Sequence, residues 1–384
     1  MGVEILWFMP IHPIGVQKRK GTMGSYYSIQ DHEAINPEFG SRQDFVELVE
    51  AIHAHGMKII LDWVANHTSW DHVWTLSNPE FFVKDADGNF TPPYDWDDVL
   101  QLDHSSVGEQ EAMINAMKFW VTGFGIDGFR ADLAHLTPLP FWIEARKQLT
   151  AINNELIWLA ETEEIHYHDA FDISFTWAWM HKTEEVCKGH ADVGALLQLL
   201  KTQQEQFPRN ARRMYFTSNH DENSWNGTEY EKYGSYARAL AVFSCCYESI
   251  PMIYNGQELP NLKRLQFFDK DVIAWNDQYG LHDFYKVLLA LRKRNRAAGA
   301  NENINTVFDE ESARKGLLIF RRLFAEDEII VVMNLAAHET RPSFPQDNHT
   351  GYKNIFTGDE VTLDEMNVAL APGDFLVLEK ITNA

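Results

Sequence analysis

The chain is poor in cysteine. Its 384 residues include three, Cys187, Cys245 and Cys246, of which two are neighbours in sequence. Adjacent cysteines rarely pair with each other, and none of the three has the spacing of a zinc site. A framework of disulfide bonds is therefore not expected. Apolar residues make up 45% of the sequence, so a large hydrophobic core is available instead.

Basic residues are also scarce. Lys and Arg total 33 against 56 Asp and Glu, which gives a net charge of −23. Such a charge disfavours nucleic acid or an anionic membrane as a partner and fits a neutral substrate. The chain has no apolar run of about 18 residues, so no membrane-spanning helix is predicted. It shows no signal peptide, and the cellular location is left open.

Strand-like and helix-like segments alternate over the first 300 residues. Seven apolar segments read as buried parallel strands, centred near residues 5, 60, 128, 158, 173, 215 and 253. Segments with a helical period lie between them, for example over 41–56, 108–123 and 140–153. This alternation predicts an α/β fold, a TIM-type β/α barrel with seven recognisable strands. Because a closed barrel of this type has eight strands, the eighth is expected before Met1.

Two regions depart from this alternation. Residues 68–107 are polar and rich in Trp, with Pro-Pro and Asp-Gly turns, and predict a short inserted domain. After residue 300, alternating segments at 316–322, 328–334 and 374–379 predict an antiparallel β domain. The expected division is a barrel over 1–67 and 108–300, an insert over 68–107, and a C-terminal β domain over 301–384.

Four short polar stretches follow predicted strands, at 62–67, 128–132, 158–161 and 218–223. In a barrel of parallel strands, residues at the carboxyl ends of the strands converge on one pocket. Three of these stretches contribute the carboxylates Asp132, Glu161 and Asp221. Carboxylates that meet in one pocket are the catalytic groups with which glycoside hydrolases break a glycosidic bond.

The first of these carboxylates, Asp132, follows Arg130 by two places on one strand, so both side chains lie on the same face. A neighbouring arginine lowers the pKa of a carboxyl group and keeps it ionised. An ionised carboxylate suits a nucleophile that attacks an anomeric carbon. The alternative is a structural Arg–Asp pair.

The second, Glu161, ends the apolar run 156–160, and an apolar setting favours a protonated carboxyl group. A protonated carboxyl is what a general acid needs at neutral pH. The alternative is a solvated glutamate in an acidic loop. Glu163 and Glu164 follow closely and compete for the same role.

The third, Asp221, lies directly after His220. A third carboxylate can stabilise the positive charge of an oxocarbenium-like transition state. An Asx turn or a helix cap explains the same residue equally well. His67 and His220 could donate hydrogen bonds to sugar hydroxyl groups, although a single histidine is more often a packed structural residue.

These stretches resemble the four motifs of the α-amylase family of glycoside hydrolases, in the same order and strand context. Residues 62–67 look like the first motif, 128–135 the second, 158–161 the third and 218–221 the fourth. The resemblance extends to residues 24–40, to 68–107 as a short B domain, and to the tail as the family's C-terminal β-sandwich.

The resemblance implies roles for individual residues. Asp132 would be the nucleophile, Glu161 the acid/base and Asp221 the transition-state stabiliser. The substrate-binding residues would be Tyr27, Asp62, His67, Arg130, His135 and His220. The implied activity is retaining hydrolysis of α-1,4-glucosidic bonds in starch and maltooligosaccharides. A cyclomaltodextrinase, a transglycosylase or an isomerase of the same clan is the alternative, and a non-catalytic glucan-binding relative is the second.

The chain departs from the family in two respects. The family's first strand and helix have no counterpart, so a homodimer is expected to cover the incomplete barrel, unless local segments do so. Many relatives bind Ca²⁺ beside the B domain, and Asn66 matches their first ligand. The acidic candidates Asp95, Asp97, Asp98 and Asp103 show no decisive pattern. Calcium is therefore a candidate structural cofactor, and the chemistry itself requires none.

Overall fold

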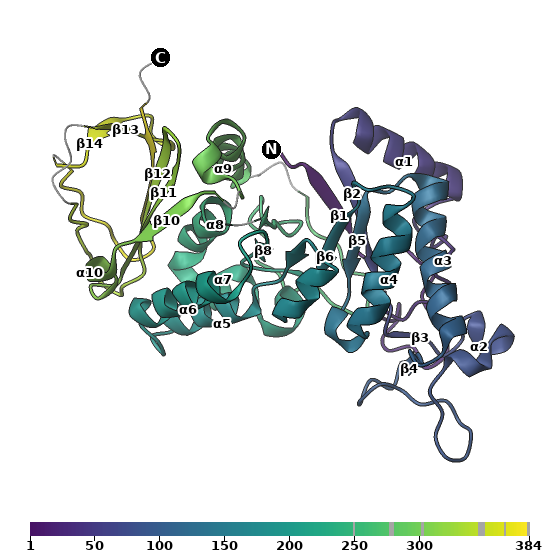
Figure 1. Ribbon diagram of the computed structural model, residues 1–384. Coiled ribbons are helices and arrows are strands. Elements are labelled where there is room, and N and C mark those ends of the chain that lie inside the picture. Colours follow the sequence, from purple (N-terminus) through teal and green to yellow (C-terminus); the bar gives the residue numbers. More distant parts are fainter. Residues whose placement is uncertain (249, 276–279, 301–302, 345–349, 365, 382–384) are drawn as a thin grey trace. The chain divides into compact units, whose positions relative to one another are not determined.

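A computed structural model describes residues 1–248, 250–275, 280–300, 303–344, 350–364 and 366–381 (Figure 1). The chain divides into two compact units. The first, here called the N-terminal unit, comprises residues 3–175 and 266–271. The C-terminal unit comprises residues 1–2, 176–265 and 272–384. No helix among the described residues is long and apolar enough to cross a membrane.

The N-terminal unit is built on parallel strands that pair in the order β1-β2-β5-β6-β7. Their bounds are Ile5–Phe8, Lys58–Trp63, Gly128–Ala131, Ile157–Ala160 and Ile173–Ser174. All five lie where the apolar segments predict them. Strand β5 is buried along its whole length, as expected for a parallel strand with both faces covered.

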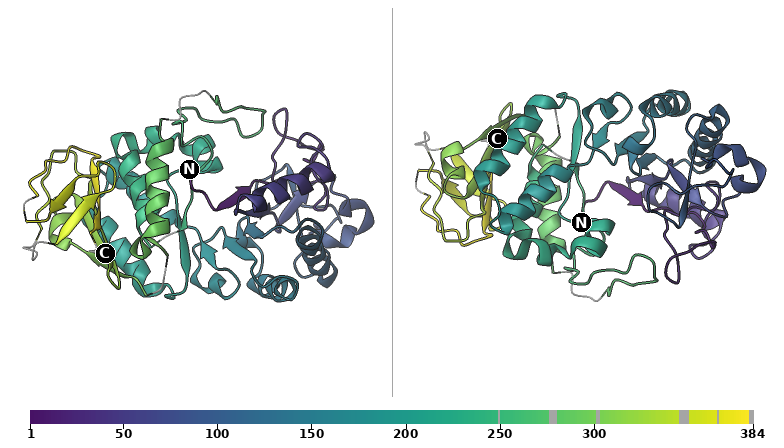
Figure 2. Two further views of the ribbon diagram at one scale, coloured as in Figure 1. Left: turned by 90° about the horizontal axis from the view of Figure 1, so that it is seen from above. Right: turned by 90° about the horizontal axis from the view of Figure 1, so that it is seen from below.

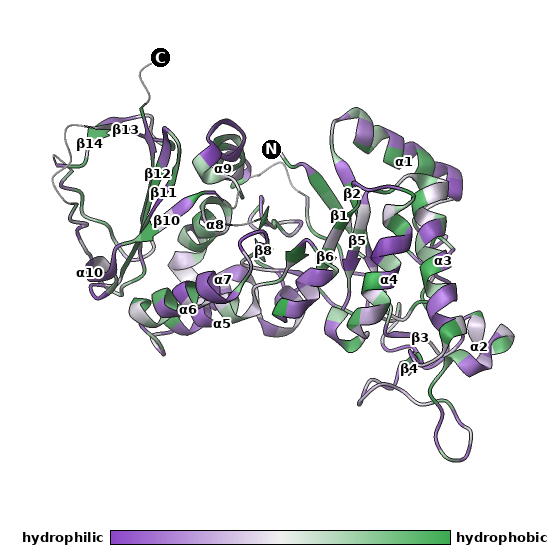
Figure 3. Cartoon of the chain, in the orientation of Figure 1, coloured by the Kyte–Doolittle hydropathy of each residue, from purple (hydrophilic) through white to green (hydrophobic). Residues whose placement is uncertain are grey.

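Helices α1 (Arg42–Ala54), α3 (Val107–Phe124) and α4 (Leu139–Thr150) lie along this sheet (Figures 1 and 2). Helix α1 is capped by Ser41, whose side chain accepts the backbone N–H of Asp44. Figure 3 shows α1 with alternating hydrophobic and hydrophilic patches, the pattern of a helix with one buried side. The core between helices and sheet contains Trp63, Trp120, Trp142 and Trp158.

Short elements complete the N-terminal unit. In the segment predicted as an insert, β3 (His67–Ser69) and β4 (Val99–Gln101) form a two-stranded antiparallel sheet. Between them lie α2 (Trp74–Ser77) and the 3₁₀ turn η1 (Pro79–Phe81). Two further 3₁₀ turns, η2 (Ala134–Leu136) and η3 (Ile165–Asp169), follow β5 and β6. The turns after β5 and β6 therefore directly follow the predicted catalytic positions.

The C-terminal unit contains the two remaining parallel strands, β8 (Arg212–Tyr215) and β9 (Ile250–Pro251). Strand β9 begins one residue earlier than predicted and is shorter, although the Met252 N–H still donates to the Tyr215 carbonyl. The helices of this unit are α5 (Trp177–Cys187), α6 (Val193–Gln206), α7 (Glu229–Tyr233), α8 (Ala237–Cys246) and α9 (His282–Arg294). Its short turns are η4 (Glu222–Asn226), η5 (Gly234–Tyr236) and η6 (Arg296–Ala298).

The tail forms one six-stranded antiparallel sheet in the order β10-β11-β12-β15-β13-β14. The strands are Asn305–Phe308, Leu317–Phe324, Asp327–Asn334, Phe375–Lys380, Gly351–Asn354 and Glu360–Thr362 in that order, and the short helix α10 (Glu310–Ala313) precedes β11. The three predicted segments correspond to β11, β12 and β15. Its core includes Ile319, Ile330, Val332 and Leu378.

Candidate active site

A single arginine on β5 holds three carboxylates at the carboxyl ends of neighbouring strands. Arg130 Nη1 lies 2.8 Å from Asp62 Oδ1 and 2.8 Å from Asp132 Oδ1. Its Nη2 lies 2.8 Å from Glu161 Oε2. The arginine is fully buried, and burial on its own would lower its pKa. The surrounding negative charge of Asp62 and Glu161 more than offsets burial and raises the pKa of Arg130 well above its usual value.

The register of the parallel strands places Asp62, Asp132 and Glu161 next to Arg130. Asp62 on β2 is directly paired with Arg130 on β5. The ladder continues past the strands, because the Asp132 N–H donates to the Trp63 carbonyl at 3.0 Å. The Glu161 N–H likewise donates to the Ala131 carbonyl at 3.0 Å. The structure thus brings Asp132 and Glu161 to adjacent strand ends, where the sequence predicted them.

Aromatic rings surround the guanidinium group of Arg130. The ring centres of Trp7, Phe175 and Tyr27 lie 5.0, 5.4 and 5.9 Å from its Cζ. Cation–π attraction adds to the ion pairs in this desolvated position. Trp7 Nε1 also donates to Asp62 Oδ2 at 3.1 Å. Trp7 and Phe175 were not predicted as site residues, although Trp7 lies within one predicted strand and Phe175 at the end of another.

The surroundings of Glu161 are more polar than the apolar run before it indicates. Besides the contact with Arg130, Glu161 Oε2 accepts the backbone N–H of Leu133 at 2.8 Å. Leu133 adopts a left-handed conformation, with φ of 39°. This turn aims its N–H group at the carboxylate. The sequence argument for an apolar pocket around Glu161 is therefore wrong, because strand neighbours that are distant in sequence supply the polar contacts.

Tyr27 lies against the same cluster. Its hydroxyl donates to Asp62 Oδ2 at 3.0 Å and accepts from Arg130 Nη1 at 3.4 Å. Its ring stacks on Phe267, with centres 6.4 Å apart and planes 12° apart. The segment that carries Phe267 is fixed nearby, because the Met23 N–H donates to the Phe268 carbonyl at 2.9 Å. No local sequence signal predicts Phe267, which is 240 residues from Tyr27.

His67 is buried at the start of β3, and its ring lies edge-on to Trp96 at 5.7 Å. Burial, assisted by the nearby His32, lowers the pKa of His67 to about 3. The ring is therefore neutral at ordinary pH, with one N–H donor and one acceptor. His135, in contrast, is exposed in η2, where its backbone carbonyl accepts the Tyr167 hydroxyl at 3.3 Å.

The candidate calcium ligands Asn66, Asp97 and Asp98 already have side-chain partners within the protein. The Asn66 side-chain amide lies 3.3 Å from His67 Nδ1. Asp97 and Asp98 both contact the ammonium group of Lys20, at 2.7 and 2.9 Å. Within the described ranges, no group of three His, Cys, Asp or Glu side chains is placed to hold a metal ion. We therefore assign no step of the chemistry to calcium.

The last predicted site residues lie in the C-terminal unit, after β8. His220 is buried, and its Nε2 lies 3.2 Å from Asp221 Oδ2. The Asp221 side chain is 37% exposed. Of the competing explanations for this stretch, the capping-type contact belongs to Asn219, whose Oδ1 accepts the N–H of Glu222, three residues on, at 2.8 Å. His220 and Asp221 thus form a second group of site residues, which belongs to the C-terminal unit.

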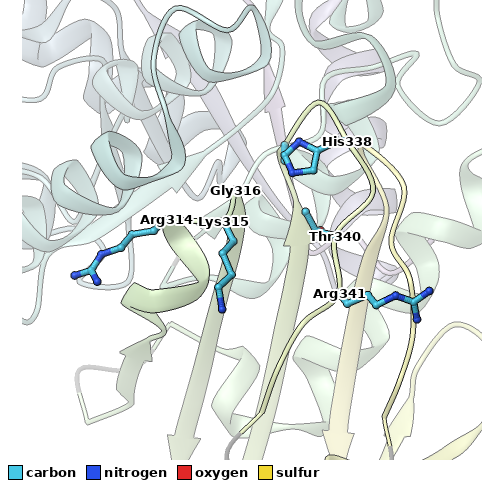
Figure 4. Close-up of a pocket in the computed structure, with 7 residues that line it drawn as sticks. Arg314, Lys315, Gly316, His338, Thr340 and Arg341 are labelled. Carbon is cyan, nitrogen blue, oxygen red and sulfur yellow. The ribbon is translucent and has the colours of Figure 1, made fainter.

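A hollow of about 470 Å³ lies on the tail sheet of the C-terminal unit. Its lining is basic and includes Arg314, Lys315, His338 and Arg341. Figure 4 shows the guanidinium groups of Arg314 and Arg341 pointing away from each other. Lys315 Nζ donates to Glu311 at 2.8 Å. These cationic groups do not converge on a common ligand position.

The chain is similar to proteins of known family. Residues 1–98 and 98–298 match the family description "Alpha amylase, catalytic domain". The structure of an α-amylase from Lactobacillus plantarum is similar with a TM-score of 0.87 and 31% identity, covering 98% of this chain and 91% of that one. A maltogenic α-amylase from Thermotoga neapolitana gives 0.88 and 28%, covering 100% and 91%. The predicted fold class is thereby confirmed.

Sequence relatives include enzymes with different named activities. An α-1,4-glucan:maltose-1-phosphate maltosyltransferase of Pseudomonas aeruginosa is 35% identical over 182 residues, which are 42% of this chain and 27% of that protein. Alpha-amylase 2 of Dictyoglomus thermophilum is 25% identical over 393 residues, covering 94% and 65%. The chain thus spans less than two thirds of the length of these relatives.

Proposed function

The chain belongs to the α-amylase family of glycoside hydrolases and transglycosylases, and on this premise we propose that it hydrolyses α-1,4-glucosidic bonds in starch and maltooligosaccharides with retention of configuration. One observation carries the proposal. Arg130 holds Asp132 and Glu161 at adjacent strand ends, each within 2.8 Å of its guanidinium group. A retaining glycosidase needs two carboxyl groups that flank the same bond.

In the proposed reaction, the Asp132 carboxylate attacks the anomeric carbon and forms a covalent glucosyl intermediate. The positive charge of Arg130 favours the ionised form that this attack requires. Glu161 gives a proton to the leaving glycosidic oxygen and then takes one from the attacking water. Its Oε2 accepts contacts from Arg130 and Leu133, so the transferred proton is assigned to Oε1.

The remaining predicted residues hold the sugar. Asp221, partly exposed and paired with His220, would stabilise the oxocarbenium-like charge and grip ring hydroxyl groups. His67 is neutral and would donate one hydrogen bond. Tyr27 and Asp62 would support Arg130, and His135 would face the leaving group. These assignments stay predictions.

A product profile tests the proposal. The purified protein should release reducing sugar from soluble starch and maltoheptaose, and the first product should have the α configuration when followed by NMR. A folded protein that acts on no α-glucan would overturn it. A product of β configuration would overturn the retaining mechanism alone.

Glucosyl or maltosyl transfer is the second candidate. It is favoured by the 35% identity with the maltosyltransferase over 182 residues. The two activities share the covalent intermediate and differ in whether water or a sugar accepts it. Incubation with maltotetraose separates them, because transfer creates products longer than the substrate and hydrolysis does not.

The expected homodimer also stays a prediction. A solution mass near twice the 44.3 kDa of the chain would support it. A solution mass equal to that of one chain, measured at the protein concentration of the enzyme assay, would contradict the homodimer.

A further inference from the structure

The backbone after Asp221 forms a π turn, η4, over Glu222–Asn226. Its closing hydrogen bond runs from the Gly227 N–H to the Glu222 carbonyl at 2.8 Å, five residues back. Such turns are rare and occur frequently at functional sites.

A buried lysine holds the turn from within the C-terminal unit. The ammonium group of Lys232, on α7, contacts the Glu222 carboxylate, and Lys232 is 3% exposed. The Asn226 amide donates to Glu222 Oε2 at 3.0 Å and to Glu184 Oε2 at 3.1 Å. Both ends of the turn are thus fixed by charge-assisted hydrogen bonds, which are stronger than neutral ones.

A second anchor fixes the middle of the turn. The Asn223 side chain donates to the Lys263 carbonyl at 3.1 Å and accepts the Leu265 N–H at 2.8 Å. This two-way contact ties the turn to the neighbouring loop. An element fixed at three positions holds its remaining side chains in a defined place.

The side chain presented by this rigid turn is Trp225, which is 58% exposed. Scattered exposed apolar residues are ordinary on protein surfaces. Trp225 differs because it lies four residues after the proposed transition-state stabiliser, on a turn whose first residue, Glu222, is held by the buried Lys232. A large flat indole held in this way can stack on the apolar face of a pyranose ring at little entropic cost.

We propose that Trp225 is a sugar-binding residue that stacks on a glucose unit of the bound α-glucan. The inference rests on the proposed function and deepens it, because it assigns one contact of the substrate chain to the turn after Asp221. Trp225 takes no part in proton transfer or bond formation. Its contribution is affinity, and it should therefore affect KM and product length more than kcat.

Steady-state kinetics on maltoheptaose test this assignment. Trp225→Ala should raise KM about fivefold with kcat within about twofold of the wild type, since one aromatic contact is worth about 1 kcal/mol. Trp225→Phe keeps a flat ring and should restore most of the affinity. Phe39→Ala removes another exposed aromatic side chain, 62% exposed in the N-terminal unit, and should leave KM unchanged.

Equilibrium binding adds a readout that a purely structural role would not move. In the Glu161→Gln background, which slows turnover, maltoheptaose should change the tryptophan emission. Adding Trp225→Phe should retain binding by calorimetry and lose most of that emission change. If the wild type acts on α-glucans and Trp225→Ala keeps the same KM and Kd, the sugar-binding role of Trp225 is wrong and the proposed function stands. A wild type inactive on every α-glucan would overturn the proposed function first.

Discussion

Asp62 and Arg130 are register partners on β2 and β5, and both are completely buried. Their ion pair measures 2.8 Å, and Asp62 accepts further hydrogen bonds from Trp7 and Tyr27 at 3.1 and 3.0 Å. Asp62 thus fixes Arg130, and Arg130 fixes Asp132 and Glu161. Rigid support of this kind is what a reacting geometry requires.

The first prediction concerns this support. Asp62→Asn should lower the free energy of unfolding by about 3–5 kcal/mol, because it leaves the buried Arg130 charge with one carboxylate fewer. Urea denaturation measures the change. Glu144→Gln, which breaks the exposed pair with Lys147, is the control and should change it by less than about 1 kcal/mol. Equal effects of the two substitutions would contradict the argument.

The acid/base assignment gives the second prediction. Glu161→Gln should lower kcat on maltoheptaose by about 10²–10⁴-fold, the usual contribution of a general acid. The circular dichroism spectrum should stay that of the wild type. Glu163→Gln changes a neighbouring glutamate and should keep most of the activity. A larger loss from Glu163→Gln would transfer the role to that residue.

Acid should destabilise the N-terminal unit through four buried histidines. His32 Nδ1 lies 3.0 Å from His72 Nε2, and His32 Nε2 lies 2.9 Å from the Val64 carbonyl. Burial is the main cause that lowers the pKa of His12 and His67 to about 3 and of His32 to about 4, and it lowers the pKa of His72 well below its usual value.

The sign of this pH dependence follows from linkage. In the unfolded chain these histidines titrate near pH 6.5, so below that pH the unfolded state binds more protons. Stability is fully present above pH 6.5 and is lost as the pH falls through the folded-state pKa values of about 4 and 3. Urea titrations at pH 7.5 and 5.0 should show the decline. His32→Gln should make the decline shallower, and an equal slope in both proteins would contradict the prediction.

The buried lysine beneath the π turn allows a fourth prediction. Lys232→Met leaves Glu222 buried without its ammonium partner and should cost about 3–5 kcal/mol of unfolding free energy. The double variant Lys232→Met/Glu222→Gln removes both charges and should recover part of the loss. Lys315→Met, at the exposed pair with Glu311, should cost less than about 1 kcal/mol. Additive losses in the double variant would argue against a direct ion pair.

A fifth prediction addresses calcium. Because Asp97 and Asp98 are already paired with Lys20, EDTA should leave the melting temperature unchanged. Differential scanning calorimetry with and without added CaCl₂ provides the check. A rise of several degrees on adding calcium would show a site that these pairs do not account for.

Much of the site is visible in the sequence because its parts follow strands. The apolar run before Asp62 and the two-residue spacing of Arg130 and Asp132 are local patterns, and each predicts a position on a strand end. The pairing of neighbouring parallel strands then places Asp62, Arg130 and Asp132 side by side. The sequence also predicted β11 and β12, whose alternation is regular.

Other features depend on contacts between distant segments, which single-sequence patterns do not carry. Phe267 lies far from Tyr27 in the chain, and Lys232 reaches Glu222 only once α7 folds back over the turn. The polar surroundings of Glu161 come from Arg130 on the neighbouring strand. Strands β13 and β14 are short, with four and three residues, and show too little alternation to be predicted.

The segment 266–271 has a consequence for biosynthesis. It belongs to the N-terminal unit, where the Thr22 N–H donates to Asp269 Oδ1 at 2.8 Å and the Phe267 ring packs on Tyr26 and Tyr27. A nascent chain that ends at residue 175 holds the strands of this unit but lacks that cover. During synthesis on the ribosome, about 100 further residues must therefore be added before Phe267 can pack on Tyr26 and Tyr27.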